Sequence, residues 1–272
     1  MPRTRKERFT DTVRDFFYRL WHYFSVCRCI GCGEIISEHA VFCEDCEKEW
    51  EAVLLSECGV CGRSLCRCLC PTDALKEARI HRQVKLYRYE TNDSDAIGNR
   101  ILYRLKENDI EMAFRFLGGL LAEKTAALLP LDESFVVTYL PRTHDRVLKH
   151  GFDQSKHLAF EVSRALALPR VKALRRTLHA KTQKKMKSVA ARKANLEKSL
   201  RLRKRAAKAI AGKRVLLIDD VITSGASVCT AARLLRKSGA REVIALSLAV
   251  VTRTENPRAV AEKNSHLPYF MR

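Results

Sequence analysis

Apolar residues along this chain fall into two patterns that alternate between about residues 84 and 251. Short apolar runs are typical of buried strands, and they occur at 84–89, 135–140, 215–218 and 242–251. Longer stretches with apolar residues at helical spacing lie between these runs and predict helices at 94–106, 111–128, 154–168 and 227–238. Strands alternating with helices predict an α/β fold with a parallel sheet.

Two further segments have no strand-like run. Residues 1–26 are basic with aromatic residues at helical spacing, which predicts a helix that packs on the body, with an anchor at a membrane surface as the alternative. Residues 181–211 predict an exposed loop followed by a charged helix. No apolar run approaches the ~18 residues needed to cross a membrane, and no secretory signal is evident. We therefore expect a cytoplasmic protein.

Ten of the eleven cysteines lie between Cys27 and Cys70. Three CxxC pairs occur there, and this spacing presents two thiolates to one tetrahedral metal ion. We favour structural zinc, because disulfides would need an oxidising compartment; an iron–sulfur cluster is the remaining alternative. A cysteine ribbon this small buries little surface, so bound metal would supply much of its folding free energy.

The order of these cysteines predicts one complete metal site and a second one with an open choice of ligands. The first site is predicted to use four thiolates, those of Cys29, Cys32, Cys43 and Cys46. The second is assigned another four, those of Cys58, Cys61, Cys66 and Cys70. Cys68 stays open as an alternative to either of the last two, because the later cysteines are spaced CxC. The number of zinc ions, one or two, is also left open.

The chain is strongly basic, with a formal net charge of +20, a pI of about 9.7 and 46% hydrophobic residues. Residues 172–214 hold 17 Lys or Arg against one acid, Glu197, and so carry +16 of that excess. This segment is either a solvated surface or a tract for single-stranded DNA or another nucleic acid. It contains no Phe, Tyr or Trp for base stacking, so binding through it would depend on phosphate contacts and on salt.

The apolar run at 215–218 ends in two carboxylates, within the stretch RVLLIDDVITSGASVCT. In parallel α/β sheets, ligands bind beyond the carboxyl ends of the strands, which is where Asp219 and Asp220 are expected. The small residues that follow suit a phosphate, because backbone amides and a helix N-terminus can approach it closely. Adjacent carboxylates can accept hydrogen bonds from two ribose hydroxyls. The alternative is a turn and helix-cap pair without a ligand.

The stretch VLLIDDVITSGAS resembles the phosphoribosyl pyrophosphate (PRPP) signature of type I phosphoribosyltransferases. With its cysteine-rich head, the chain is similar to the ComF/GntX family of bacterial proteins over roughly residues 29–251. That family's R-G-F-N-Q segment is matched by His150-Gly151-Phe152-Asp153-Gln154, and its Q…R-x-x-N stretch by Gln183, Arg192 and Asn195. The departures from the family pattern are His150 for Arg, Asp153 for Asn, Ala180 for Thr, and CxC in the last knuckle.

This resemblance implies a role for each matched residue. Asp219 and Asp220 would hold the ribose hydroxyls as catalytic carboxylates, and Asp220 could accept a proton. The 5-phosphate would bind the loop formed by Thr223, Ser224, Gly225, Ala226 and Ser227. The pyrophosphate, with Mg²⁺ held mainly by substrate oxygens, would bind near Pro141, Arg142 and Arg146. A mobile hood would cover the site with Lys181, Gln183, Lys184, Lys185 and Arg192.

The expected organisation is a type I phosphoribosyltransferase fold with a small zinc ribbon. The predicted segments are a basic helix (1–26), a double zinc ribbon (27–72), a phosphoribosyltransferase-like domain (73–255) with a basic hood (178–211), and a tail (256–272). The resemblance implies a PRPP-binding protein linked to DNA uptake in natural transformation. A non-enzymatic nucleotide sensor or DNA-binding module is the main alternative, and purine salvage is less favoured. Catalysis, the acceptor and the oligomeric state are left open.

Overall fold

The computed structural model describes residues 27–37, 40–107, 111–177 and 199–251. Several predictions lie outside these ranges. They are the N-terminal helix at 1–26, the tail at 256–272 and, within residues 178–198, the hood residues Lys181, Gln183, Lys184, Lys185 and Arg192.

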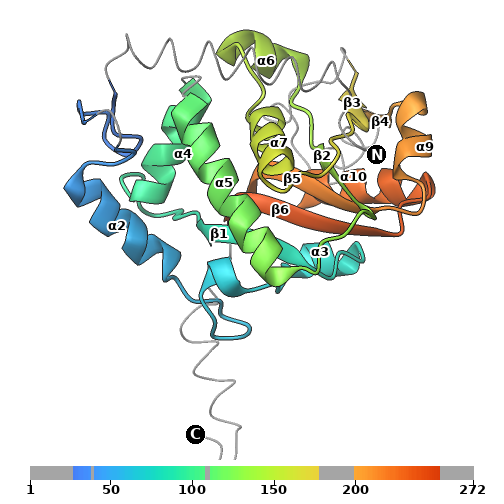
Figure 1. Ribbon diagram of the computed structural model, residues 1–272, viewed down its shortest axis with the longest axis horizontal. Coiled ribbons are helices and arrows are strands. Elements are labelled where there is room, and N and C mark those ends of the chain that lie inside the picture. The colour runs from blue at the N-terminus through green and yellow to red at the C-terminus, as the bar shows by residue number, and fades with distance from the viewer. Residues whose placement is uncertain (1–26, 38–39, 108–110, 178–198, 252–272) are drawn as a thin grey trace, which may run out of the picture.

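A four-stranded parallel sheet forms the centre of the protein, with the strand order β1-β6-β5-β2 (Figure 1). The strands are β1 (Gln83–Arg88), β2 (Phe135–Tyr139), β5 (Arg214–Ile222) and β6 (Glu242–Val250). Each predicted apolar run therefore forms a strand, and the predicted parallel α/β sheet is confirmed. Parallel neighbours need long crossover connections, which accounts for the helices between the strands.

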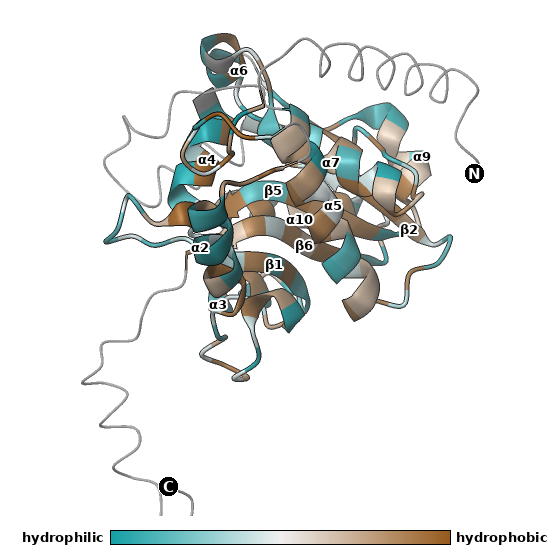
Figure 2. Cartoon of the chain, turned by 60° about the vertical axis from the view of Figure 1, so that its left-hand side comes forward, coloured by the Kyte–Doolittle hydropathy of each residue, from teal (hydrophilic) through white to brown (hydrophobic). Residues whose placement is uncertain are grey.

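Helices cover both faces of this sheet, so its strands are buried on both sides (Figures 1 and 2). Leu216 and Ile218 of β5 pack in the core formed with α5 (Glu111–Leu128) and α7 (Gln154–Ala165). The alternate residues Val215 and Leu217 pack in the core formed with α3 (Asp73–Glu77) and α10 (Ala226–Lys237). This alternation follows from successive side chains in a strand pointing to opposite faces.

Several elements differ from their predicted bounds, α7 for example ending at Ala165, and for two of them the reason is local. The strand β5 continues through the acid pair to Ile222, because Asp219 and Val221 remain in register with Ser247 and Ala249 of β6. The helix predicted at 94–106 is α4 (Ile97–Glu107). It begins later because the Asp93 carboxylate accepts hydrogen bonds from the backbone amides of Asp95 and Ala96 and so forms a turn there.

A small antiparallel hairpin has its second strand within residues 181–211, where the sequence predicted a loop and a charged helix. It consists of β3 (Leu174–Arg176) and β4 (Leu200–Leu202), and it brackets residues 178–198. Only short helical turns follow it, η3 (Lys204–Ala206) and α9 (Ala207–Ile210). In each of these short strands a buried Leu is followed by an exposed Arg, which is the pattern of a sheet with one buried face. The many basic residues of this segment made that alternation difficult to recognise in the sequence.

The cysteine-rich head packs directly on the sheet domain. It contains α2 (Glu44–Leu54) and the turn η1 (Leu65–Arg67). The Trp50 ring of α2 lies 5.2 Å from the Tyr87 ring of β1, and Phe42 lies 5.6 Å from Phe116 of α5. The start of the head thus shares the core of α5 and α7. Within the residues that the structure describes, no helix is long and apolar enough to cross a membrane.

Candidate functional site

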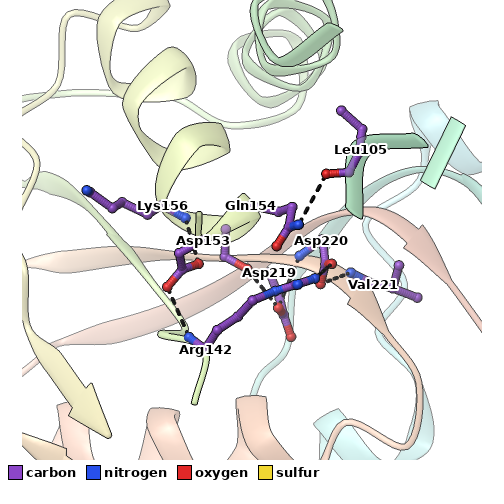
Figure 3. Close-up of polar contacts among 9 residues, drawn as sticks. Leu105, Arg142, Asp153, Gln154, Lys156, Asp219, Asp220 and Val221 are labelled. Atoms are coloured by element: carbon purple, nitrogen blue, oxygen red, sulfur yellow. Dashed lines mark hydrogen bonds and ion pairs between the residues drawn. The ribbon is translucent and has the colours of Figure 1, made fainter. Parts of the chain in front are cut away.

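The acid pair lies near the carboxyl end of β5, where each carboxylate has a different partner (Figure 3). Arg142 donates from Nη2 to Asp220 Oδ2 at 2.8 Å, and these side chains are only 10% and 14% exposed. Ser155 donates from Oγ to Asp219 Oδ1 at 3.0 Å. The Arg142 guanidinium thus balances the charge of Asp220, whereas Asp219 accepts a hydrogen bond from a neutral hydroxyl.

The loop that carries Arg142 is fixed by two groups that sequence reasoning did not assign to the site. Asp153 accepts from the Arg142 amide at 3.0 Å and from the Lys156 amide at 3.2 Å, and so it also caps α7 (Figure 3). Arg176 donates from Nε to the Pro141 carbonyl at 2.9 Å. An Asp directly before a predicted helix was the signal available for Asp153.

The matched segment His150-Gly151-Phe152-Asp153-Gln154 forms the connection between α6 (His144–His150) and α7. Gly151 adopts a φ of 77°, a left-handed conformation that favours glycine. The Phe152 ring packs 6.0 Å from Phe114 of α5, and Gln154 donates to the Leu105 carbonyl at 3.1 Å. The segment therefore turns the chain so that Asp153 reaches the Arg142 loop.

The acid pair lies in a buried environment, where the charged form of a carboxyl group is unfavourable. Burial raises the pKa of the Asp219 carboxyl well above its ordinary value, and the neighbouring Asp220 charge raises it further. Burial also raises the pKa of Asp153, although hydrogen bonds from the Arg142 and Lys156 amides oppose this. A ligand that brings hydroxyl donors to Asp219 would favour its charged form.

The predicted phosphate loop follows at once and leads into α10. Thr223 and Ser224 are exposed, whereas Gly225 is buried and has a φ of 71° at the N-terminus of α10. Such a conformation is easy only for glycine, and it turns the chain so that the first amides of α10 stay available to an anion. Arg146, predicted at the pyrophosphate, lies exposed on α6, and its charge lowers the pKa of Arg176 after the larger effect of burial.

The first cysteine cluster has the predicted ligand set. The sulfurs of Cys29, Cys32, Cys43 and Cys46 all lie within 4.8 Å of one another. A backbone amide, that of Gly31, donates to Cys29 Sγ at 3.3 Å. Although burial acts to raise it, backbone hydrogen bonds lower the pKa of Cys29 to about 6, whereas burial raises the pKa of Cys32 and Cys46. Of these three thiols, Cys29 therefore loses its proton most readily, and thiolate is the form that binds metal.

The second cluster corrects the assignment of one ligand. Its four sulfurs, again within 4.8 Å of one another, belong to Cys58, Cys61, Cys68 and Cys70. Cys66 was assigned to this group with Cys68 left open as the alternative, and the structure brings the Cys68 sulfur, not that of Cys66, to the other three. The turn η1 directs the Cys66 thiol to the Leu54 carbonyl, 3.4 Å away, and this leaves Cys68 Sγ 3.5 Å from Cys61 Sγ.

Comparisons with known proteins indicate which family the sheet domain resembles. Residues 154–269 match the phosphoribosyl transferase domain family. The chain is 32% identical over 122 residues to competence protein F of Haemophilus influenzae, covering 44% of this chain and 52% of that protein. It therefore spans about half the length of this relative. The chain carries a ComF-like phosphoribosyl transferase domain.

Two further matches are shorter or weaker. A ribose-phosphate pyrophosphokinase of Prochlorococcus marinus is 56% identical over 36 residues, which are 13% of this chain and 11% of that protein. A solved structure of the allosteric regulatory enzyme of purine biosynthesis aligns with a TM-score of 0.35 and 23% identity. That alignment covers 50% of this chain and 25% of the enzyme.

In this ComF-like protein, the chemistry of both cysteine clusters fits zinc. Four sulfurs at mutual reach are the donor set of structural zinc sites. Each cluster also has a cation from the sheet domain near its sulfurs, since Arg100 of α4 lies 3.9 Å from Cys46 Sγ and Lys85 of β1 lies 3.4 Å from Cys68 Sγ. Zinc with four thiolates keeps a net negative charge, which these cations offset.

Proposed function

We propose that this protein binds PRPP with Mg²⁺ at the carboxyl end of β5. The observation that carries the proposal is the ion pair between Arg142 and Asp220, which lies beside a glycine-capped helix N-terminus. Ribose hydroxyls would donate to Asp219 and Asp220, and the 5-phosphate would bind the loop at 223–227. The domain match over residues 154–269 supports the same ligand class.

The ion pair itself suits a ligand that has both hydroxyl donors and phosphate acceptors. A ribose hydroxyl can replace Arg142 as the donor to Asp220, which frees the guanidinium to pair with pyrophosphate oxygens. Neither charge is then left buried alone, a situation that would be costly. Mg²⁺, which prefers substrate phosphates and water, would be held mainly by the pyrophosphate, with the acid pair as the available protein carboxylates.

Such a site could support transfer of the phosphoribosyl group. A nitrogen nucleophile would form a bond to C1 of the ribose while the bond from C1 to the pyrophosphate oxygen breaks. Arg142 would stabilise charge on the leaving pyrophosphate, and the acid pair would stabilise the positive ribose. The proton released from the nucleophile could pass to Asp220.

Calorimetric titration with PRPP and Mg²⁺ tests the binding. We expect saturable heat with the natural chain and its loss in the double variant Asp219→Asn/Asp220→Asn. The control is Asp145→Asn, which removes an exposed carboxylate on α6 and should leave the heat unchanged. Absence of binding by the natural chain would overturn the proposal. Pyrophosphate release in the presence of candidate bases and amines then tests for catalysis.

A second function, binding of single-stranded DNA, is favoured by the charge of the hairpin. Arg175 of β3 lies directly opposite Arg201 of β4, and both are exposed. Two exposed guanidinium groups at facing positions present positive charge together, and this suits the phosphates of a nucleic acid. The likeness to a protein named competence protein F supports a link to competence, and we propose that this link is a role in DNA uptake in the cytoplasm.

A salt series of DNA binding separates this function from the first. Binding through phosphate contacts should weaken steeply as salt rises. The double variant Arg175→Gln/Arg201→Gln should reduce the salt dependence, whereas Lys48→Gln/Arg63→Gln removes the same charge from the head and should not. Equal effects of the two double variants would show that only net charge matters and would remove the hairpin from the DNA site.

A further inference from the structure

The second cysteine cluster is joined to the central sheet by a buried lysine. Lys85 of β1 is only 3% exposed, and its Nζ donates to the Cys70 carbonyl at 2.8 Å and to Cys68 Sγ at 3.4 Å. A buried ammonium is costly unless it is fully partnered. This contact therefore fixes the end of the cluster relative to β1.

The chain that leaves this cluster leads directly to the candidate phosphate loop. The Thr72 amide donates to Gln83 Oε1 at 3.2 Å, so the segment between the cluster and α3 is bonded to the start of β1. The side chain of Leu75, in α3, is fully buried beneath the loop. A Cβ atom added to Gly225 would lie 3.3 Å from Leu75 Cδ2, which places α3 against the backbone of the phosphate loop.

The same short helix also supports α10. Cys229, in the first turn of α10, donates from Sγ to the Ala74 carbonyl at 3.3 Å. Arg236, in its last turn, donates to the Ala78 carbonyl at 2.6 Å. The position of α10, whose N-terminal amides would face the phosphate, therefore depends on the segment that begins at Cys70.

A row of polar residues also crosses the sheet between the cluster and the acid pair. Lys85 is in register with Ser247 of β6, and Ser247 is in register with Asp219 of β5. Residues in register on neighbouring strands point to the same face, and such strands are about 4.8 Å apart. The row thus has one end at Cys68 of the cluster and the other in the acid pair.

The first cluster is connected to a different part of the protein. A Cβ atom on Gly31 would lie 2.5 Å from Ile97 Cδ1, and Arg100 joins Cys46 to Glu49, whose Oε2 is 2.6 Å from Arg100 Nη2. Its contacts are with α4 and α2, on the side of the sheet that α5 covers. The two clusters therefore provide a matched pair for comparison.

We propose that metal held by the second cysteine cluster positions the candidate phosphate loop, with Lys85 and Leu75 as positioning residues. Metal binding at this cluster and binding of a phosphorylated ribose then strengthen each other. The identity of the ligand rests on the proposed function, whereas the coupling between the cluster and the loop does not. Because coupling is reciprocal, each partner must raise the affinity of the other by the same factor.

The test compares one exposed cysteine from each cluster, Cys61→Ser and Cys32→Ser, in the full zinc-loaded chain. We expect Cys61→Ser to lose zinc from the second cluster, to speed amide hydrogen exchange over residues 223–230 and to weaken ribose 5-phosphate binding about fivefold or more. Cys32→Ser should leave exchange over 223–230 unchanged and speed exchange in α4. Equal effects of the two variants on 223–230, or no effect of Cys61→Ser there, would overturn the proposal.

Two further measurements test the coupling if Cys61→Ser does not fold or if its zinc loss is incomplete. If Cys61→Ser does not fold, Lys85→Met keeps every cysteine and nearly the same side-chain volume, and it should weaken zinc at the second cluster and speed exchange over 223–230. In the natural chain, saturating ribose 5-phosphate should slow zinc loss from the second cluster to a chelator. If the natural chain binds no ribose 5-phosphate, the proposed function fails, while hydrogen exchange still decides the coupling.

Discussion

The candidate PRPP site and the cysteine clusters both gather negative charge, but they balance it with different cations. At the acid pair, the charge on Asp220 is balanced by a side chain, Arg142, at 2.8 Å. In the first cluster, Arg100 approaches a single sulfur at 3.9 Å, and four thiolates remain that need a metal ion. A side-chain cation can change partners when a phosphate arrives, whereas a metal ion inside four thiolates is part of the fold. Charge balance thus separates a binding site from a structural one.

The largest effect on stability is expected from loss of metal at the first cluster. Cys46 is 2% exposed and belongs to the core that α4 and α5 share, so metal loss there disturbs the sheet domain as well as the head. We expect Cys46→Ala to bind one zinc ion per chain fewer and to lose about 5 kcal/mol or more of unfolding free energy. Elemental analysis and thermal unfolding measure the two quantities.

Cys66→Ala is the matched control for that experiment, because it removes another buried thiol that lies outside both ligand sets. It should keep the zinc content of the natural chain, whereas Cys68→Ala should lower it by one ion. Loss of zinc in Cys66→Ala would show that the assignment of Cys68 as the ligand is wrong.

The next largest effect is expected at the ion pair. Arg142→Gln leaves the Asp220 carboxylate, 14% exposed, without its cation, and we expect a loss of about 2–3 kcal/mol. The double variant Arg142→Gln/Asp220→Asn should recover much of this loss, since neither charge then remains. Chemical denaturation of the natural chain, Arg142→Gln, Asp220→Asn and the double variant measures the coupling. If the double variant is no more stable than Arg142→Gln, the ion pair does not stabilise the fold.

Features formed by residues that are close together in the sequence were predictable. Apolar runs predicted all four strands of the sheet. Three of these runs are nearly continuous in hydrophobic residues, as expected of strands buried on both faces, whereas the run of β1 also contains Lys85 and Arg88. The CxxC spacing predicted which four sulfurs of the first cluster come together, since the members of each pair are close in sequence, one pair in a turn and the other at the start of α2. The helix at 111–128 was predicted with its observed bounds because its apolar spacing is uninterrupted.

The partners that lie far apart along the chain were not predictable from pattern. Arg142 and Asp220 are 78 residues apart, and Ser155 and Asp219 are 64 apart, so only the fold brings them together. The exchange of Cys66 for Cys68 depends on one turn, η1, whose hydrogen bonds leave no mark in the cysteine spacing. Arg176 could not be distinguished by sequence from the many basic residues around it.

A smaller effect is expected at the phosphate loop, where two glycines provide a controlled pair. Gly225 and Gly212 have nearly the same φ, 71° and 70°, but an added Cβ meets Leu75 only at Gly225. Each change to alanine should cost about 1 kcal/mol from the left-handed backbone. Only Gly225→Ala should also weaken ribose 5-phosphate binding. Unfolding and binding measurements on both variants check this, and equal binding would place the phosphate elsewhere.

The smallest effect concerns Asp219, whose charge the fold opposes. Because burial and Asp220 raise its pKa in the folded state, the unfolded chain loses this proton first as pH rises, and stability falls above the unfolded value of about 4. Asp219→Asn removes this term and can still accept from Ser155. We expect its Tm at pH 7 to rise by about 2 °C while PRPP binding is lost. Thermal unfolding at pH 5 and pH 8 should show the gain growing with pH. A Tm that falls at both pH values would mean that Asp219 is charged and stabilising in the free protein, and that its role there is structural.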